Sequence, residues 1–240
     1  MTSANELYKH WAGDPPRDPR TGESLDPRGK EWLFELFASL VPKPGDFLLD
    51  VGARDGKHFK RLVEAHDLRG LALDPVPNGP DVVEGVIESI PLADESVDWI
   101  WARDMLVHVD LAPAFAECVR VLKPGGRMFA YVTLATAELE PRERAWLCDG
   151  AALRNLDGEQ IEAAASALTL EQKIELGSEW RERMVEDGEW DPTDALLRLA
   201  RMRRLGIDSP IDRADLSWGI YQLLGKTCPT VYVWSKTSSA

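Results

Sequence analysis

Cysteines are few in this sequence, and no two of them form a recognisable pair. The three are Cys118, Cys148 and Cys228, and none stand in a Cys-x-x-Cys pattern. This spacing argues against both a disulfide framework and a zinc site, so we expect no bound metal. A reduced, cytoplasmic protein is the expectation that follows.

Long apolar stretches are also missing. No run approaches the roughly 18 consecutive apolar residues that a membrane helix needs. The N-terminal stretch MTSANELYKHWAGDPP lacks the basic start and apolar run of a signal peptide. We therefore expect a soluble protein without a membrane partner. Its 240 residues fit one ordinary domain, or one domain with a modest appendage.

Positive charge is scarce as well. There are 28 Lys and Arg against 41 Asp and Glu, which gives a formal net charge of -13. Such an excess repels phosphate backbones and anionic membranes, so nucleic acid is not an expected partner. One basic cluster, LLRLARMRRLG, runs against this trend. We interpret it as a solvated helix face in preference to an anion-binding patch.

Among the aromatic residues, tyrosine and phenylalanine are few and tryptophan is unusually common. The chain has 9 Trp but only 6 Phe and 4 Tyr. Tryptophan is favoured where a flat, amphipathic surface must hold a ligand. The composition therefore predicts an aromatic-walled binding site.

What the sequence does contain is a repeated alternation of strands and helices. Short apolar runs predict strands, and segments with an apolar stripe between them predict helices. This alternation favours an α/β fold with a doubly wound sheet that carries helices on both faces. The expected strands are 47–51, 70–74, 81–87, 96–102 and 126–135, and the expected helices between and before them are 30–40, 56–66 and 111–122.

The alternation changes after about residue 136. The following segments are mostly helical and charged, apart from a strand expected in LEQKIEL and an alternating strand in PTVYVWSKT. We divide the chain into an N-terminal arm and helix that form a lid (1–44), a cofactor-binding core (45–136), and the rest of the sheet with helical inserts that cap the substrate (137–240).

The segment LLDVGARDGKH carries the strongest chemical signal. Asp50 ends the first strand, and Gly52 and Gly56 bracket a tight turn before a helix. A strand, glycine loop and helix bring a ligand close to bare backbone and to the helix N-terminus. The second strand ends in Asp74, where an acid can accept both hydroxyls of a ribose. These features predict a nucleoside-containing cofactor.

The acid before the loop selects among such cofactors. A dinucleotide site needs Gly-x-Gly-x-x-Gly for its pyrophosphate, whereas this chain has Asp50-x-Gly52-x-x-x-Gly56. A carboxylate beside the loop repels pyrophosphate and attracts an ammonium group. S-adenosylmethionine (SAM) has an ammonium, a sulfonium and a ribose but no phosphate, so the charge pattern favours it over NAD.

At these residues the sequence resembles the class I SAM-dependent methyltransferase family, in particular its small-molecule branch. The resemblance covers about residues 45–135, through FLLDVGARDG, GLALDP, ESIPLADESVDWIWARDMLVHV and RVLKPGGRMF in this order. It implies a seven-stranded, mostly parallel sheet of the Rossmann-like methyltransferase type with a helical substrate cap. It also implies SAM as cofactor and S-adenosylhomocysteine (SAH) as its product.

The resemblance assigns roles to residues that match the family's motifs. It implies that the first loop holds the methionine part of the cofactor, that the second strand's end holds the ribose and adenine, and that the turn after the fourth strand lies beneath the sulfur. The residues are Asp50, Gly52, Ala53 and Gly56 for the methionine part, Asp74 for the ribose, Pro75, Ile87 and Glu88 for the adenine, and Ala102 and Arg103 for the turn, with Arg103 and Asp104 also able to orient the substrate.

Two positions depart from the family pattern. Arg54 stands where the family usually has a third glycine, so its side chain must point outward or reshape the loop. Val86 stands where an acidic residue is common, so the adenine amine must be read by backbone or by Glu88.

The acceptor side is less well marked. His108 matches the second histidine of the family's Leu-His-His-Val run, and it is either a general base or a structural residue. Tyr8 and Trp11 resemble an aromatic lid, with a merely disordered arm as the alternative. Trp146, Trp218 and Tyr221 lie in the later inserts and suit the walls of a flat, apolar acceptor site.

These observations predict a SAM-dependent methyltransferase acting on a small molecule, possible acceptors being aromatic or polycyclic, with O-methylation slightly favoured. We expect a monomer or a homodimer. Two alternatives stay open: a quinone- or sterol-type C-methyltransferase, and a relative without transfer activity that serves as a SAM-binding cyclase, sensor or subunit.

Overall fold

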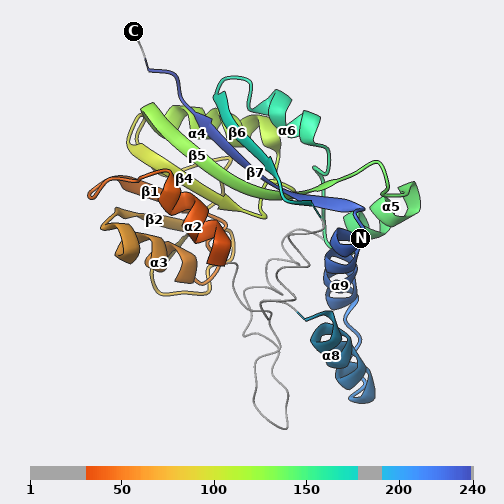
Figure 1. Cartoon of the computed structure of the whole chain (residues 1–240). Coiled ribbons are helices and arrows are strands. Elements are labelled where there is room, and N and C mark those ends of the chain that lie inside the picture. The colour runs from red at the N-terminus through yellow and green to blue at the C-terminus, as the bar shows by residue number, and fades with distance from the viewer. Residues whose placement is uncertain (1–30, 178–190, 239–240) are drawn as a thin grey trace.

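A seven-stranded sheet forms the centre of the molecule, seen here in a computed structural model that describes residues 31–177 and 191–238 (Figure 1). Its strand order is β3-β2-β1-β4-β5-β7-β6. The strands are β1 (Phe47–Val51), β2 (Arg69–Asp74), β3 (Val82–Glu84), β4 (Val97–Arg103), β5 (Leu122–Ala135), β6 (Thr169–Glu175) and β7 (Thr227–Ser235).

Most neighbouring strands run parallel. β1 pairs in parallel with β2 and β4, β2 with β3, and β4 with β5, whereas β7 is antiparallel to both β5 and β6. The prediction of a seven-stranded, mostly parallel, doubly wound sheet is confirmed. Because β7 is reversed, its first residues lie at the edge of the sheet where the parallel strands end.

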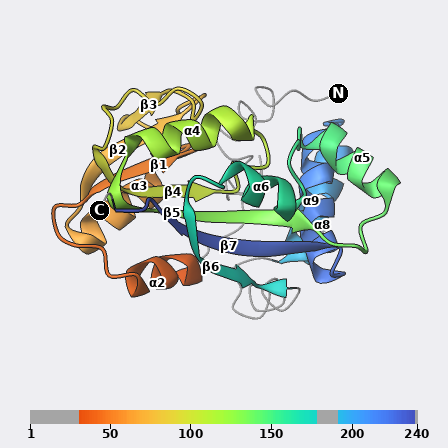
Figure 2. The same ribbon diagram turned by 90° about the horizontal axis from the view of Figure 1, so that it is seen from above.

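Helices cover both faces of the sheet, and each face has its own apolar core. α2 (Glu31–Ser39) and α3 (Lys57–His66) cover one face, and α4 (Leu111–Val121) and α6 (Gly158–Ala164) cover the other; Figure 2 shows α2 and α4 on opposite sides. Successive strand residues alternate between the two cores, as the period of two in a strand requires. Leu48 belongs to the core beneath α2 and α3, and Leu49 belongs to the core beneath α4 and α6.

Tryptophan fills much of these cores. Trp101 stacks on Phe129 with ring centroids 4.7 Å apart, on the face that α2 covers. Trp234 stacks on Tyr232 at 4.6 Å on the opposite face. Trp99 is also buried. Part of the tryptophan excess is therefore structural, because stacked rings bury large apolar areas between helices and sheet.

Three further helices lie beyond the edge where the parallel strands end (Figure 1). α5 (Pro141–Gly150) follows β5, while α8 (Pro192–Arg204) and α9 (Pro210–Leu223) precede β7. A buried ion pair joins α8 to α9, with Arg198 Nη2 and Asp212 Oδ1 3.2 Å apart. In the described part of the chain, no helix is long and apolar enough to cross a membrane.

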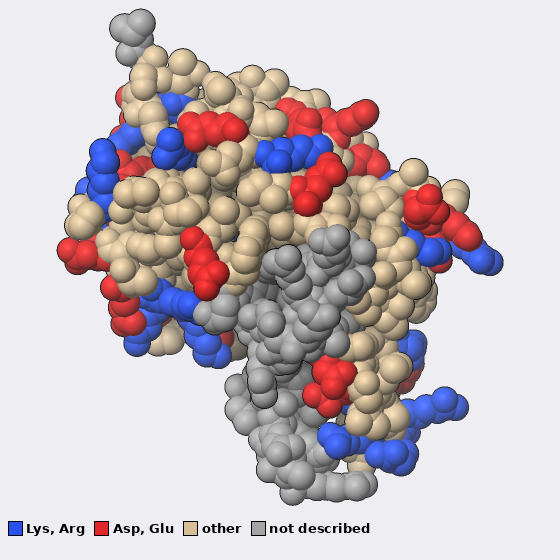
Figure 3. Space-filling view, in the orientation of Figure 1, with Lys and Arg blue, Asp and Glu red and all other residues tan. Residues whose placement is uncertain are grey.

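The basic cluster of α8 has both buried and exposed members. Arg198 is buried in the ion pair, so the prediction of a solvated face is wrong for it. Arg203 and Arg204 are exposed, as predicted. Elsewhere on the face drawn in Figure 3, acidic and basic side chains are interspersed and form no large field of one sign.

Candidate cofactor and acceptor site

The glycine loop between β1 and α3 adopts a backbone that its two glycines make possible. Gly52 has φ +77° and Gly56 has φ +74°, in the left-handed region that side chains disfavour. A Cβ atom at Gly52 would lie 3.1 Å from Cβ of Met105, and one at Gly56 would lie 2.9 Å from a methyl group of Val82. Both positions therefore need glycine for conformation and for space.

Hydrogen bonds from β2 hold this loop in place. The N–H groups of Gly52 and Ala53 both donate to the Leu73 carbonyl at 2.9 Å. The buried Asp74 carboxylate accepts the N–H of Arg54 on one oxygen and the N–H of Val76 on the other, each at 2.8 Å. Asp74 thus fixes the loop, and each oxygen keeps a further lone pair for a ribose hydroxyl. Burial raises the pKa of Asp74.

Arg54 adopts a left-handed conformation that favours glycine. Its φ is +53°, which costs an ordinary residue roughly 1–2 kcal/mol. The hydrogen bond from its N–H to Asp74 keeps it there. The position of the missing third glycine therefore carries backbone strain.

Asp50 is the most unusual group of the site. It is 2% exposed, and its Oδ2 atom is buried without a hydrogen-bond partner among the described residues. Burial raises the pKa of Asp50 to about 7, although the positive charge of Arg103 lowers it and the negative charges of Asp74 and Asp55 add to the rise. A buried carboxylate without a donor is costly, and an ammonium group would satisfy it. These residues therefore fit the methionine end of SAM.

Arg103, at the end of β4, lies beside a partner that the sequence did not reveal. Its Nη1 is 3.5 Å from Nε2 of His58, and the imidazole of His58 packs edge-on against Phe34 at 5.0 Å. Phe34 lies on α2, so this helix covers part of the half-buried imidazole. Ala102, the preceding residue, is buried.

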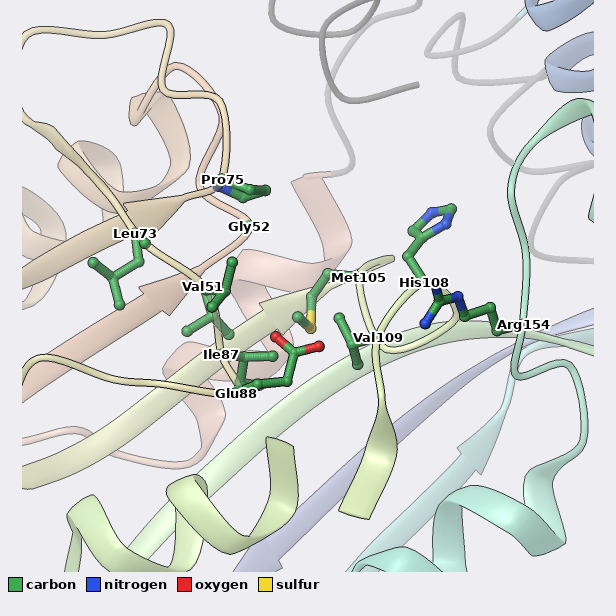
Figure 4. A pocket seen from close by; sticks show the side chains of 12 residues that line it. Val51, Gly52, Leu73, Pro75, Ile87, Glu88, Met105, His108, Val109 and Arg154 are labelled. Carbon is green, nitrogen blue, oxygen red and sulfur yellow. The ribbon is translucent and has the colours of Figure 1, made fainter. Parts of the chain in front are cut away.

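A pocket opens at the same edge of the sheet (Figure 4). Of the predicted residues, Gly52, Pro75, Ile87, Glu88 and His108 line it. Glu88 also holds the next segment, because its Oε1 accepts the N–H of Asp110 at 3.1 Å. The remaining residues of the lining are Val51, Leu73, Gly85, Val86, Met105, Val109 and Arg154.

His108 has a defined environment in this pocket. It is 3% exposed, and its Nδ1 lies 3.1 Å from the Ala152 carbonyl, which requires Nδ1 to carry the hydrogen. In the neutral ring Nε2 is then the acceptor nitrogen. Burial lowers the pKa of His108 to about 4, so the ring is neutral at neutral pH. Figure 4 shows His108 next to Arg154, whose positive charge adds to the lowering.

The predicted aromatic wall is not part of this pocket. Trp146 is 39% exposed on α5 and donates its indole N–H to Ser217 Oγ at 3.4 Å. Trp218 and Tyr221 are half-buried on α9 and pack against the core. None of the three lines the pocket. Their role as acceptor walls stays a prediction.

Two further groups of predicted residues lie elsewhere. The Asp104 carboxylate accepts a hydrogen bond from Thr133 Oγ1 at 3.4 Å and is outside the lining. Tyr8 and Trp11, the predicted lid, lie outside the described residues. The pocket therefore brings Gly52, Pro75, Ile87 and Glu88 together with His108, and it adds Met105 and Arg154, for which the sequence carried no motif. The other predicted cofactor residues lie outside its lining: Asp50, Ala53, Gly56, Asp74, Ala102 and Arg103.

The comparison with protein families agrees with this geometry. Residues 49–130 match the model of a family described as "Methyltransferase domain". These residues include the glycine loop, Asp74, the turn after β4 and His108.

Individual relatives have related names. An uncharacterized methyltransferase of Mycobacterium tuberculosis is 38% identical over 115 residues, which cover 44% of each chain. A malonyl-[acyl-carrier protein] O-methyltransferase of Methylococcus capsulatus is 35% identical over 161 residues, which cover 60% of this chain and 55% of the relative. The chain spans about half the length of the curated relatives it matches.

The fold also has solved counterparts. A phosphoethanolamine N-methyltransferase of Haemonchus contortus, solved in complex with SAM, superposes with a TM-score of 0.68 over 99% of this chain and 58% of that one. Its sequence identity is 15%. The likeness therefore concerns the fold.

Proposed function

We propose that the chain is a class I, SAM-dependent methyltransferase that transfers the methyl group of SAM to a small-molecule acceptor. Residues 49–130 match a family described as "Methyltransferase domain". The observation that carries the proposal is the Asp50 carboxylate, buried beside the glycine loop with an oxygen that has no described partner. A ligand that brings a donor to this point would satisfy it, and the ammonium of SAM is such a donor.

The residues of the loop and of the neighbouring strand ends would hold the rest of the cofactor. Asp74 retains acceptor capacity for the ribose hydroxyls, and Pro75, Ile87 and Glu88 lie where the adenine would be bound. When bound, SAM supplies an electrophilic methyl group, and the chain supplies alignment. This assignment makes residues 45–136 the cofactor-binding part and leaves the acceptor to 137–240 and the arm.

His108 and Arg154 give the acceptor side its chemistry. The imidazole of His108 is neutral and lines the pocket, so we assign it the role of general base for an oxygen acceptor. The relative named as an O-methyltransferase supports oxygen over carbon. An aromatic or polycyclic acceptor would have to extend from this pocket to the rings on α9.

Calorimetric titration with SAM and with SAH tests the cofactor part of the proposal. We expect micromolar binding of both, and we expect Asp50→Asn to weaken SAM by roughly tenfold because a charge-assisted bond is lost. Asp67→Asn is the matched control, since Asp67 is an exposed acid at the opposite edge of the sheet. Absence of binding to the unmodified chain would contradict the proposal.

Labelled SAM then separates the alternatives. Incubation with metabolite extracts should move the labelled methyl group to a small molecule, and the linkage of the label identifies oxygen or carbon as the acceptor atom. A carbon-linked label would favour the quinone- or sterol-type C-methyltransferase. Tight binding of SAM without any transfer of label would favour the cyclase, sensor or subunit.

A further inference from the structure

A short segment on the acceptor side clasps the turn that carries His108. We call Ala152–Asn155 the clamp. Its backbone approaches the turn 105–109 at Val107, whose carbonyl accepts the N–H of Arg154 at 2.7 Å and the N–H of Asn155 at 3.2 Å. The carbonyl of Ala152 accepts Nδ1 of His108. The turn and the imidazole are thus held from the same segment.

The side chain of Asn155 completes the clamp. Its Nδ2 donates to the Leu106 carbonyl at 2.8 Å and to the Val109 carbonyl at 2.7 Å. These carbonyls stand on either side of His108 in the chain, and both residues are buried. Buried carbonyls need donors, and a primary amide has two hydrogens diverging from one nitrogen, as two separate acceptors require. A carboxylate of the same shape would offer no hydrogen-bond donor.

The backbone of the clamp is itself strained. Ala152 has φ +52°, a left-handed conformation that a residue with a side chain rarely adopts. Strain of this kind persists where surrounding contacts enforce it, and it gathers at functional sites. At Ala152 it accompanies the carbonyl that fixes the tautomer of His108.

We propose that Asn155 is a positioning residue of methyl transfer: it holds the turn 105–109 so that His108 keeps its Nδ1–H tautomer and its place in the pocket lining. This inference rests on the proposed function for its catalytic meaning. The hydrogen bonds of the clamp do not depend on the proposed function. Asn155 acts through His108, lies outside the pocket lining, and makes no contact that the cofactor residues use.

Nitrogen NMR of the histidine side chains in the full chain tests the proposal. In the unmodified protein we expect His108 as the Nδ1–H tautomer, with an abnormally acidic titration. In Asn155→Asp, which removes both donors, we expect a mixture of tautomers and a titration shifted toward that of an ordinary histidine. Asn155→Ser keeps one donor and should lie between the two, and it replaces the Asp variant if that one does not fold.

Two controls separate positioning from general damage. Gln172→Glu changes an amide to an acid at an exposed residue of β6 and should leave His108 unchanged. Ile161→Val removes a methyl group from the core, so it lowers stability without touching the clamp. An unaltered His108 tautomer and titration in folded Asn155→Asp or Asn155→Ser would overturn the proposal, as would equal changes in Ile161→Val.

SAM titration and label transfer connect the clamp to the reaction. SAM affinity is measured for each Asn155 variant, because Met105 of the held turn lies against Gly52 and both line the pocket, and transfer is then compared at SAM concentrations that saturate each variant. At saturating SAM, label transfer should fall about tenfold in Asn155→Asp and recover in part in Asn155→Ser, as for a mispositioned base. Transfer equal to the unmodified rate would overturn the proposal. SAM binding that fails in the unmodified chain would instead overturn the proposed function and leave the NMR result standing.

Discussion

The two sides of this site are built in different ways. The cofactor side is held by backbone: left-handed glycines, N–H groups that donate to the Leu73 carbonyl, and a carboxylate that accepts two more N–H groups. The acceptor side depends on side chains that meet between distant segments, such as Arg198 with Asp212 and Asn155 with the turn 105–109. Backbone requirements restrict which residues fit, so they leave a pattern in the sequence. Contacts between side chains leave almost none.

Breaking the ion pair between α8 and α9 should give the largest effect, and only on the acceptor side. Arg198→Met leaves the buried Asp212 without its cation, which costs about 3–5 kcal/mol. We expect urea unfolding and hydrogen exchange to show loss of α8 and α9, while SAM affinity stays within about threefold, a difference under about 1 kcal/mol. Lys60→Met breaks an exposed pair instead and should cost less than about 0.5 kcal/mol. A comparable loss of SAM affinity would show that the two sides are not independent.

A change in the glycine loop tests the cofactor side instead. Gly52→Ala adds a Cβ atom 3.1 Å from Met105 in a left-handed conformation, so the loop must move. We expect SAM affinity to fall roughly 100-fold by calorimetry, since small displacements of a binding loop are this costly. Gly45→Ala is the control, because Gly45 has φ +83° but open space around it. It should lower stability by about 1–2 kcal/mol and leave SAM binding intact. Equal SAM affinities of the two variants would refute the role of the loop.

The pH dependence of SAM binding sharpens the same comparison. The pKa of Asp50 is raised to about 7, and only its ionised form attracts the ammonium, so affinity must fall as the pH drops through this value. Between pH 7.5 and pH 5.5 the ionised fraction falls about 25-fold, but the neutral side chain should still bind SAM about one tenth as tightly, as Asn does, so we expect SAM affinity to fall by about sixfold. Asn at position 50 does not titrate, so Asp50→Asn should give a nearly flat profile. A flat profile of the unmodified chain would exclude Asp50 as the ammonium partner.

Arg54 gives the smallest expected effect. Arg54→Gly removes the strain of a side chain at φ +53°, but glycine also loses more entropy on folding. The net change should be a gain of about 0.5 kcal/mol in the free energy of unfolding, measured by urea. SAM affinity should not change, because Arg54 lies outside the pocket lining and the N–H at position 54 still donates to Asp74. A clear loss of stability would mean that the Arg54 side chain contributes more than its backbone costs.

Much of the fold follows from the sequence, because strand patterns and glycines are local signals. The ends of the strands are less predictable, because they depend on pairing with distant strands. β3 keeps only Val82–Glu84 of the expected 81–87, since its pairing with β2 ends at Glu84 and Asp74, and Val86 instead forms an isolated bridge with Ser89. β5 begins at Leu122 instead of 126, because Leu122 pairs with Val97 across the register shift in β4.

The candidate site likewise has residues that the sequence could predict and contacts that it could not. Asp50, Gly52 and Asp74 could be predicted because each follows directly from a strand end. His58 and Arg103 come together from positions 45 residues apart, and Asn155 meets carbonyls 46 and 49 residues before it, so no spacing reveals either contact. Tryptophan content could not say which rings face a ligand. Trp99 and Trp101 lie two residues apart on β4, so strand alternation puts both on one buried face.

The antiparallel strand β7 also determines how the acceptor side is attached. The chain leaves the sheet after β6 at Leu176, whose N–H donates to the Pro229 carbonyl at 2.8 Å, and it returns at Thr227. The intervening stretch, 177–226, therefore starts and finishes on adjacent rungs of one ladder. A stretch anchored in this way can be lengthened or exchanged at an entropic cost that grows only with the logarithm of its length. Under the proposed assignment of the acceptor to 137–240, acceptor preference can thus diversify, in nature or by grafting, while the scaffold that would bind the cofactor stays the same.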